Sequence, residues 1–119
     1  MKRDMDLVRE MLCEVEKTDT FGTQIHLKFD GYSPEEIDYH ILLLSDADLI
    51  KTDPPRDIER KRRPVRLTWE GHEFVEAARD DARWNQAKEM MKGTGGFVVE
   101  IAKSLLIDLA KEQIKTGLQ

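Results

Sequence analysis

Residues 33–51 read SPEEIDYHILLLSDADLIK, and this stretch decides the fold. Ser33 can accept a hydrogen bond from the backbone N–H of Glu36, and the Glu36 side chain can reach back to the backbone of Ser33. Pro34 suits the first position of a helix because its fixed φ is already helical. The pattern predicts a helix from Pro34 to about Ala47. The residues expected on its inner side are Ile37, His40, Ile41 and Leu44.

A β-hairpin is expected directly after this helix. Residues 49–51 (LIK) are expected to form a short strand, the sequence Asp53-Pro54-Pro55 ends it, and residues 64–67 are expected to return as the second strand. The tip of this hairpin is rich in Lys and Arg. A helix that leads into a two-stranded hairpin is the core of a winged helix-turn-helix.

Two elements are expected before this core. Residues 4–17 repeat apolar side chains every three to four positions, which predicts an amphipathic helix. Residues 24–29 alternate polar and apolar side chains, which is typical of a half-buried strand with Ile25, Leu27 and Phe29 inward. This strand takes the place of the usual second helix of the motif.

Two helices are expected after the hairpin. Thr68 can cap a long helix over residues 69–92, Gly93–Gly96 would end it, and a last helix is expected over residues 97–115. The inner positions of the long helix would be Gly71, Phe74, Val75, Ala78, Ala82, Trp84, Ala87 and Met91. The last helix carries more apolar surface than one partner helix needs, which suggests a dimer interface formed by Ile101, Leu105, Leu106 and Leu109.

The predicted fold class is therefore α+β, winged helix-turn-helix-like, with a small antiparallel sheet and two additional C-terminal helices. We divide the chain into a winged-helix-like domain over residues 1–92 and a C-terminal helix over residues 93–119 that packs or dimerises. A length of 119 residues with 39% hydrophobic residues supports a single core. No run of 18 apolar residues and no signal-peptide pattern occur, and the single cysteine excludes a disulfide framework, so we expect a cytoplasmic protein.

The distribution of charge is more informative than the net value of −5. Residues 30–50 contain six acids and no Lys or Arg, whereas residues 51–66 contain seven bases and three acids. In a winged helix the helix over residues 34–47 would read DNA, but its outward carboxylates oppose contact with phosphates. The basic hairpin can contact phosphates. The candidate nucleic-acid-binding residues are Arg56, Arg60, Lys61, Arg62, Arg63 and Arg66.

Four stretches carry a resemblance to a known family. They are residues 1–7 (MKRDMDL), 31–40 (GYSPEEIDYH), 66–74 (RLTWEGHEF), and 79–81 (RDD) together with 84–85 (WN). The chain resembles an uncharacterised bacterial and prophage family, a domain of unknown function with a winged-helix-like fold. The resemblance covers nearly the whole chain and implies that fold and a phage-like context, but it implies no activity. One departure is Asp48, where such proteins usually have a glycine after the helix.

Enzymatic or metal chemistry is not expected. His72 and Glu76 lie one helical turn apart, but no third ligand is evident, and His26, His40 and Cys13 form no recognisable constellation. Gly93–Gly96 lacks the lysine and the spacing of a phosphate-binding loop. We expect no cofactor. Trp69 and Trp84 are predicted to be anchors in the core or a dimer interface, with a base-stacking platform as the less favoured alternative.

Two functions remain open. The first is a nucleic-acid-associated or regulatory module that contacts phosphates through its basic wing. The second is a homodimeric protein–protein interaction adaptor that has kept the winged fold and has lost DNA reading. The lack of any cation between residues 30 and 50 favours the second.

Overall fold

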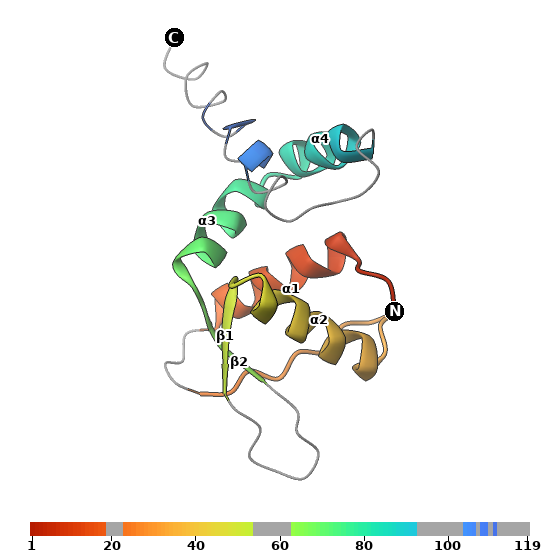
Figure 1. Cartoon of the computed structure of the whole chain (residues 1–119), viewed down its shortest axis with the longest axis vertical. Helices are drawn as coiled ribbons and strands as arrows, with labels where there is room; N and C mark the ends of the chain where they lie inside the picture. Colours follow the sequence, from red (N-terminus) through yellow and green to blue (C-terminus); the bar gives the residue numbers. More distant parts are fainter. Residues whose placement is uncertain (19–22, 54–62, 93–103, 107, 110, 112–119) are drawn as a thin grey trace. The chain divides into compact units, whose positions relative to one another are not determined.

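The computed structural model describes residues 1–18, 23–53, 63–92, 104–106, 108–109 and 111. Within these residues the fold is mixed α+β, with a small two-stranded antiparallel sheet. The elements are α1 (Met5–Lys17), α2 (Pro34–Asp46), β1 (Ile50–Asp53), β2 (Arg63–Leu67), α3 (Trp69–Ala78) and α4 (Asp81–Lys92), and they are labelled in Figure 1. Residues 104–106, 108–109 and 111 are also helical, within the predicted last helix. The predicted glycine break at 93–96 lies outside the described residues.

The chain divides into two compact units, Met1–His72 and Glu73–Gln119, and each is described by itself. This division falls within α3, and the domain boundary expected after residue 92 stays a prediction. The first unit holds α1, α2 and the hairpin.

Helix α1 begins as the sequence predicts. The Asp4 side chain caps it, because its Oδ1 atom accepts hydrogen bonds from the backbone N–H groups of Asp6 at 3.0 Å and Leu7 at 3.2 Å. One side of the helix is buried, through Met5, Leu7, Val8, Met11, Leu12 and Val15. The predicted amphipathic helix is confirmed.

Helix α2 shows the predicted capping box. The Ser33 hydroxyl accepts from the Glu36 N–H at 3.1 Å, and the Glu36 carboxylate accepts from the Ser33 N–H at 3.2 Å. The four residues predicted for its inner side, Ile37, His40, Ile41 and Leu44, are all buried.

The end of α2 is a left-handed turn at Asp48, whose φ is +58°. The Asp48 N–H donates to the Ser45 carbonyl and the Leu49 N–H donates to the Leu44 carbonyl, each at 3.0 Å. These two hydrogen bonds define the Schellman motif, in which glycine is usual at the left-handed position. Leu44 and Leu49 are buried at the two ends of the second bond. Asp48 therefore adopts the conformation that glycine would adopt with less strain.

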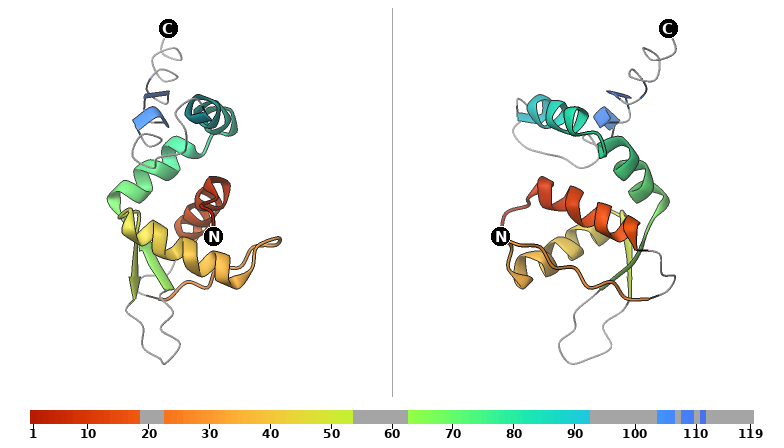
Figure 2. Two further views of the ribbon diagram at one scale, coloured as in Figure 1. Left: turned by 45° about the vertical axis from the view of Figure 1, so that its right-hand side comes forward. Right: turned by 180° about the vertical axis from the view of Figure 1, so that it is seen from behind.

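The predicted hairpin is confirmed as β1 and β2. Ile50 pairs with Leu67 and Lys51 pairs with Arg66, and the register shifts between Lys51 and Thr52. Ile50, Pro64 and Leu67 are buried, whereas Lys51 and Arg66 are exposed. Helix α1 contacts β2 and α2 contacts β1, and both helices direct their C-terminal ends toward the hairpin (Figures 1 and 2).

The predicted strand over residues 24–29 is wrong. The segment is extended, but a single backbone hydrogen bond, from the Ile25 N–H to the Pro64 carbonyl at 2.8 Å, joins it to β2. One bond does not make a ladder, although the predicted alternation holds: Ile25 is buried, Leu27 and Phe29 are half-buried, and the residues between them are exposed. The alternation of polar and apolar residues therefore predicted correctly which side chains are buried, but it did not predict whether the segment pairs with a strand.

The predicted single helix over residues 69–92 is also wrong, because α3 ends at Ala78 and α4 begins at Asp81. Asp80 caps α4, since its Oδ1 accepts from the Arg83 N–H at 2.9 Å. The Arg83 guanidinium turns back and donates to the carbonyls of Ala77 and Glu76, each at 3.1 Å. One side chain thus satisfies the end of α3, and Ala82 is exposed rather than buried.

The second unit has an aromatic centre. Phe74 and Trp84 meet edge to face, with 6.1 Å between ring centroids and 72° between ring planes. Trp84 is 1% exposed and is therefore a core anchor, as predicted. Among the described residues of this unit, the other buried apolar side chains are Val75, Ala77, Ala78, Ala87, Met91 and Leu106.

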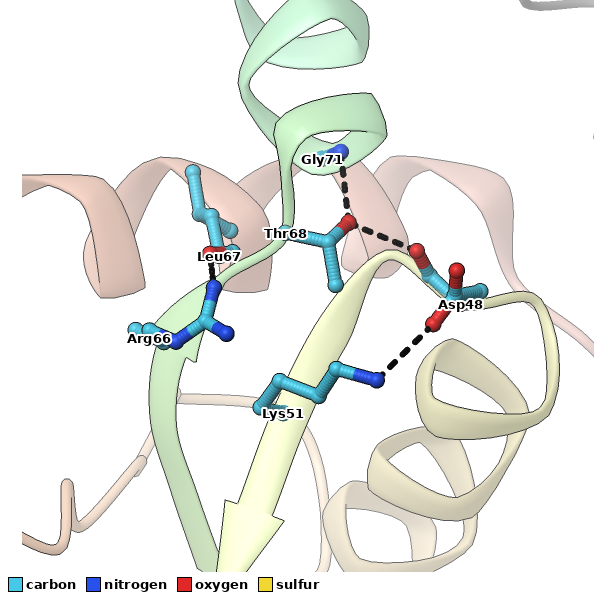
Figure 3. Close-up of polar contacts among 6 residues, drawn as sticks. All are labelled: Asp48, Lys51, Arg66, Leu67, Thr68 and Gly71. Atoms are coloured by element: carbon cyan, nitrogen blue, oxygen red, sulfur yellow. Dashed lines mark hydrogen bonds and ion pairs between the residues drawn. The ribbon is translucent and has the colours of Figure 1, made fainter.

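Thr68 joins the turn after α2 to the start of α3 (Figure 3). Its hydroxyl donates to the Asp48 carbonyl oxygen at 2.6 Å and accepts from the Gly71 N–H at 3.0 Å, as an N-cap does. Its own N–H donates to the Leu49 carbonyl oxygen at 3.1 Å. We call these three hydrogen bonds the Thr68 clasp.

Gly71 allows the first turn of α3 to lie directly against the Leu49 backbone. A Cβ atom at position 71 would lie 2.1 Å from the Leu49 carbonyl oxygen and 3.2 Å from the Leu67 Cβ. Two residues of the segment 67–71 are therefore explained by their contacts. Thr68 caps α3, and Gly71 has no side chain that would collide with the Leu49 backbone.

We predict that Gly71→Ala lowers the free energy of unfolding by about 3 kcal/mol, because the added methyl overlaps a backbone oxygen that cannot rotate away. Chemical denaturation monitored by circular dichroism measures the effect. The control is Gly31→Ala: Gly31 has φ +86° and nothing within 4 Å of an added Cβ, so only the conformational cost of about 1 kcal/mol is expected. Equal losses for both variants would contradict the close approach at Gly71.

We predict that Asp48→Gly raises the free energy of unfolding by about 0.5–1 kcal/mol, because it removes the strain of a left-handed non-glycine residue. The variant also loses an ion pair with Lys51, but both side chains are exposed and such pairs contribute little. Asp48→Ala loses the same pair and keeps the strain, so it should be less stable than the unaltered chain. A higher melting temperature for Asp48→Ala than for Asp48→Gly would contradict backbone strain at this position.

Candidate nucleic-acid interface

The structure places two of the six predicted phosphate-binding residues. Arg63 and Arg66 lie on β2, Arg63 half-buried at its start and Arg66 exposed near its end. The other four, Arg56, Arg60, Lys61 and Arg62, lie outside the described residues. The described part of the interface is therefore the base of the hairpin.

A like-charge pair lies across this base. Lys51 on β1 is directly opposite Arg66 on β2, and both are exposed. Like charges directly opposite each other destabilise a β-ladder. Lys51 was not among the predicted site residues, and the signal that could have identified it is the hairpin register, which places it beside Arg66.

Each cation of the pair has one further contact (Figure 3). The Lys51 ammonium lies 3.3 Å from the Asp48 carboxylate, and the Arg66 guanidinium donates to the Leu67 carbonyl oxygen at 3.0 Å. The Lys51–Asp48 pair is solvated, with side-chain exposures of 55% and 65%, so its two charges can exchange partners at small cost. Both cations are thus held near the surface of the hairpin and remain open to an anion.

The extended segment before α2 adds polar contacts at the edge of β2. The Arg63 guanidinium donates to His26 Nδ1, and the Gln24 side-chain amide donates to the Asp53 carboxylate at 3.1 Å. His26 is exposed, and its Nδ1 is the partner of the Arg63 guanidinium. This contact joins the extended segment to the start of β2.

The exposed side of α2 is acidic and partly apolar. Glu35 and Asp46 are exposed, Asp38 is half-buried, and Leu42 is 47% exposed. No Lys or Arg occurs between residues 30 and 50, so no cation of α2 can offset these carboxylates. This helix presents the opposite charge to that of the hairpin.

His40 is a structural residue. It is buried, its Nε2 accepts from the Asp4 N–H at 2.9 Å, and its Nδ1 lies 2.7 Å from the Glu36 carbonyl oxygen. An acceptor at Nε2 requires the proton to lie on Nδ1, which donates to Glu36. The neutral ring therefore connects the start of α1 to the first turn of α2.

The remaining predicted side chains are dispersed. His72 is exposed on α3, and within the described residues no group of three His, Cys, Asp or Glu side chains lies close enough to hold a metal ion. Cys13 is half-buried and lines an open hollow of about 340 Å³ on α1, together with two cations and two acids. The lining residues are Arg9, Glu10, Cys13, Glu14, Lys17 and Phe29.

The predicted dimer residues are described in part. Leu106 is fully buried within the chain, Leu105 and Leu109 are half-buried, and Ile101 lies outside the described residues. Trp69 is not a core residue, because it is 78% exposed at the first position of α3. None of the helices in the described part of the chain is long and apolar enough to cross a membrane.

The geometry defines a small α+β protein with a cationic hairpin beside an acidic helix. The chain belongs to the family described as "Hypothetical protein (DUF2513)", whose model matches residues 2–97. This result agrees with the resemblance to a domain of unknown function. The chain is also similar to an "Uncharacterized protein" of Haemophilus influenzae, with 34% identity over 94 residues that cover 77% of this chain and 80% of the relative. No solved structure shows significant similarity to this chain.

The Tyr32 hydroxyl donates to the second oxygen of the Asp4 carboxylate at 3.0 Å. This hydrogen bond, followed by desolvation and by the charges of nearby carboxylates, raises the pKa of Tyr32 from 10.0 to about 12. The folded chain therefore keeps a proton that the unfolded chain loses. The resulting stabilisation is complete below pH 10 and is lost as the pH rises toward about 12.

We predict that Asp4→Asn moves the pKa of Tyr32 back toward 10.0, because the ionised acceptor is removed. Asparagine caps helices as well as aspartate does, so α1 should remain folded. Tyrosinate absorbance in a Tyr39→Phe background reports Tyr32 alone. Asp6→Asn is the matched control, since it removes one nearby charge without touching the hydroxyl. An equal shift in both variants would contradict the hydrogen bond as the main cause.

Proposed function

We propose that this chain is a non-enzymatic, winged-helix-like module that contacts nucleic-acid phosphates through its cationic hairpin. The observation that carries the proposal is the exposed pair Lys51 and Arg66, two cations directly opposite each other on a two-stranded sheet. Such a pair weakens the hairpin alone, and a phosphate near both groups would relieve the repulsion. The sequence between the two strands, residues 54–62, adds four further bases against two acids, a net charge of +2.

The winged-helix part of the proposal is supported by element order. Helix α2 is followed directly by an antiparallel hairpin, and the buried side of the hairpin contacts the helices while its cations face solvent. In winged helices the hairpin can follow a backbone or a minor groove while a helix enters the major groove. Here the acidic surface of α2 opposes such entry, so we propose contact through the hairpin with little base reading from α2.

We predict that Lys51→Gln/Arg66→Gln weakens binding to mixed-sequence nucleic acid about tenfold or more at low salt. The slope of log affinity against log salt should also fall by about two, one for each lost phosphate contact. Heparin retention and fluorescence anisotropy measure both effects. The matched control is Lys2→Gln/Arg3→Gln, which removes one lysine and one arginine charge from two exposed residues just before α1, at the end of that helix that lies away from the hairpin. Equal losses in both variants, or no binding by the unaltered chain at low salt, would refute contact through the hairpin.

The second candidate is a protein-interaction adaptor. The observation that favours it is the acidic surface of α2, where Leu42 is 47% exposed between carboxylates and no cation is present. Such a surface suits a cationic partner with an apolar contact at its centre, including the hairpin of a second copy. Sedimentation distinguishes this case: an adaptor that pairs with itself should sediment above 13.8 kDa, and Leu42→Lys should restore the monomer.

A further inference from the structure

Trp69 is the most exposed large apolar side chain among the residues that the structure describes. It is 78% exposed, whereas Trp84 in the second unit is 1% exposed. Tryptophan is a large hydrophobic side chain whose burial is strongly favourable, so a solvent-exposed one requires an explanation.

The backbone at Trp69 is fixed although its side chain is exposed. Thr68, the preceding residue, is buried and makes the three hydrogen bonds of the Thr68 clasp. Gly71, two residues later, lies against the Leu49 carbonyl oxygen. The indole is thus presented from a rigid position, so little backbone freedom would be lost when a ligand binds to it.

The two cations of the hairpin are near Trp69 along the chain and across the sheet. Arg66 precedes Trp69 by three residues, so their Cα atoms are at most about 11 Å apart. Lys51 is directly opposite Arg66. The junction of the hairpin and α3 therefore carries two exposed cations and one exposed aromatic residue, within three residues along the chain or directly opposite across the sheet.

We propose that Trp69 stacks on an unpaired nucleobase while Lys51 and Arg66 contact the adjacent phosphates, so that the ligand is a single-stranded nucleic acid. This inference rests on the proposed function and specifies its ligand. Aromatic rings beside a positively charged surface are the combination that binds single strands, because every base has a stacking face. In a duplex those faces are already covered by neighbouring bases, and only base edges and phosphates remain available.

The test compares the affinities of the full chain for oligothymidylate and oligouridylate of about 12 nucleotides with its affinity for a duplex of the same length. We expect single strands to bind at least about tenfold more tightly than the duplex, and to protect Trp69 fluorescence from acrylamide quenching. Trp69→Ala should weaken single-strand binding about 10- to 100-fold with little effect on the duplex. Trp69→Phe should retain most of the affinity. The DNA and RNA oligomers decide which of the two is preferred.

Leu42→Ala is the matched control, because it truncates another exposed apolar residue of the same unit. Single-strand binding that depends on Lys51 and Arg66 but is unchanged in Trp69→Ala would overturn stacking and leave phosphate contact intact. A preference for duplex that depends on the two cations would do the same. No binding of any oligomer at low salt would overturn both this inference and the proposed function.

Discussion

Thr68 makes the connection on which the rest of the first unit depends. One hydroxyl serves as an acceptor for the start of α3 and as a donor to the carbonyl oxygen of Asp48, while the amide of the same residue bonds to Leu49. Because Thr68 is buried, water cannot replace these partners, and an unsatisfied buried group costs about 1–3 kcal/mol. The turn after α2, the base of the hairpin and the first turn of α3 are therefore positioned together.

This connection also separates the two surfaces of the hairpin. The buried side, formed by Ile50, Pro64 and Leu67, supplies the packing, so the exposed side does not have to contribute to the core. Lys51 and Arg66 can therefore lie opposite each other although their repulsion weakens the pairing. Acidic α2 and the cationic hairpin are adjacent in sequence but present different surfaces. The net charge of −5 describes neither of them.

The sequence was sufficient to predict those features that depend only on residues close together in the chain, such as helix caps. The Ser33 capping box and the Thr68 cap were predicted because both partners lie within three residues of each other. The break at Asp80 was missed because no Gly or Pro marks it, and the cap depends on an ordinary aspartate. The extended segment at residues 24–29 was wrongly predicted as a strand. Alternating polar and apolar residues indicate which side chains are buried, whereas strand pairing depends on backbone hydrogen bonds to β2, which is distant in the sequence. Lys51 was missed as a site residue because only the hairpin register brings it opposite Arg66.

The left-handed turn at Asp48 affects both the stability of the fold and the surface of the hairpin beside it. Glycine would relieve the backbone at this position, but glycine has no carboxylate with which to hold the Lys51 ammonium. Asp48 thus combines a strained backbone with a solvated contact to a surface cation. Relatives with glycine at this position would have a more stable turn and a less constrained lysine. Variation at this one residue would therefore change the freedom of the Lys51 side chain without altering the architecture around it.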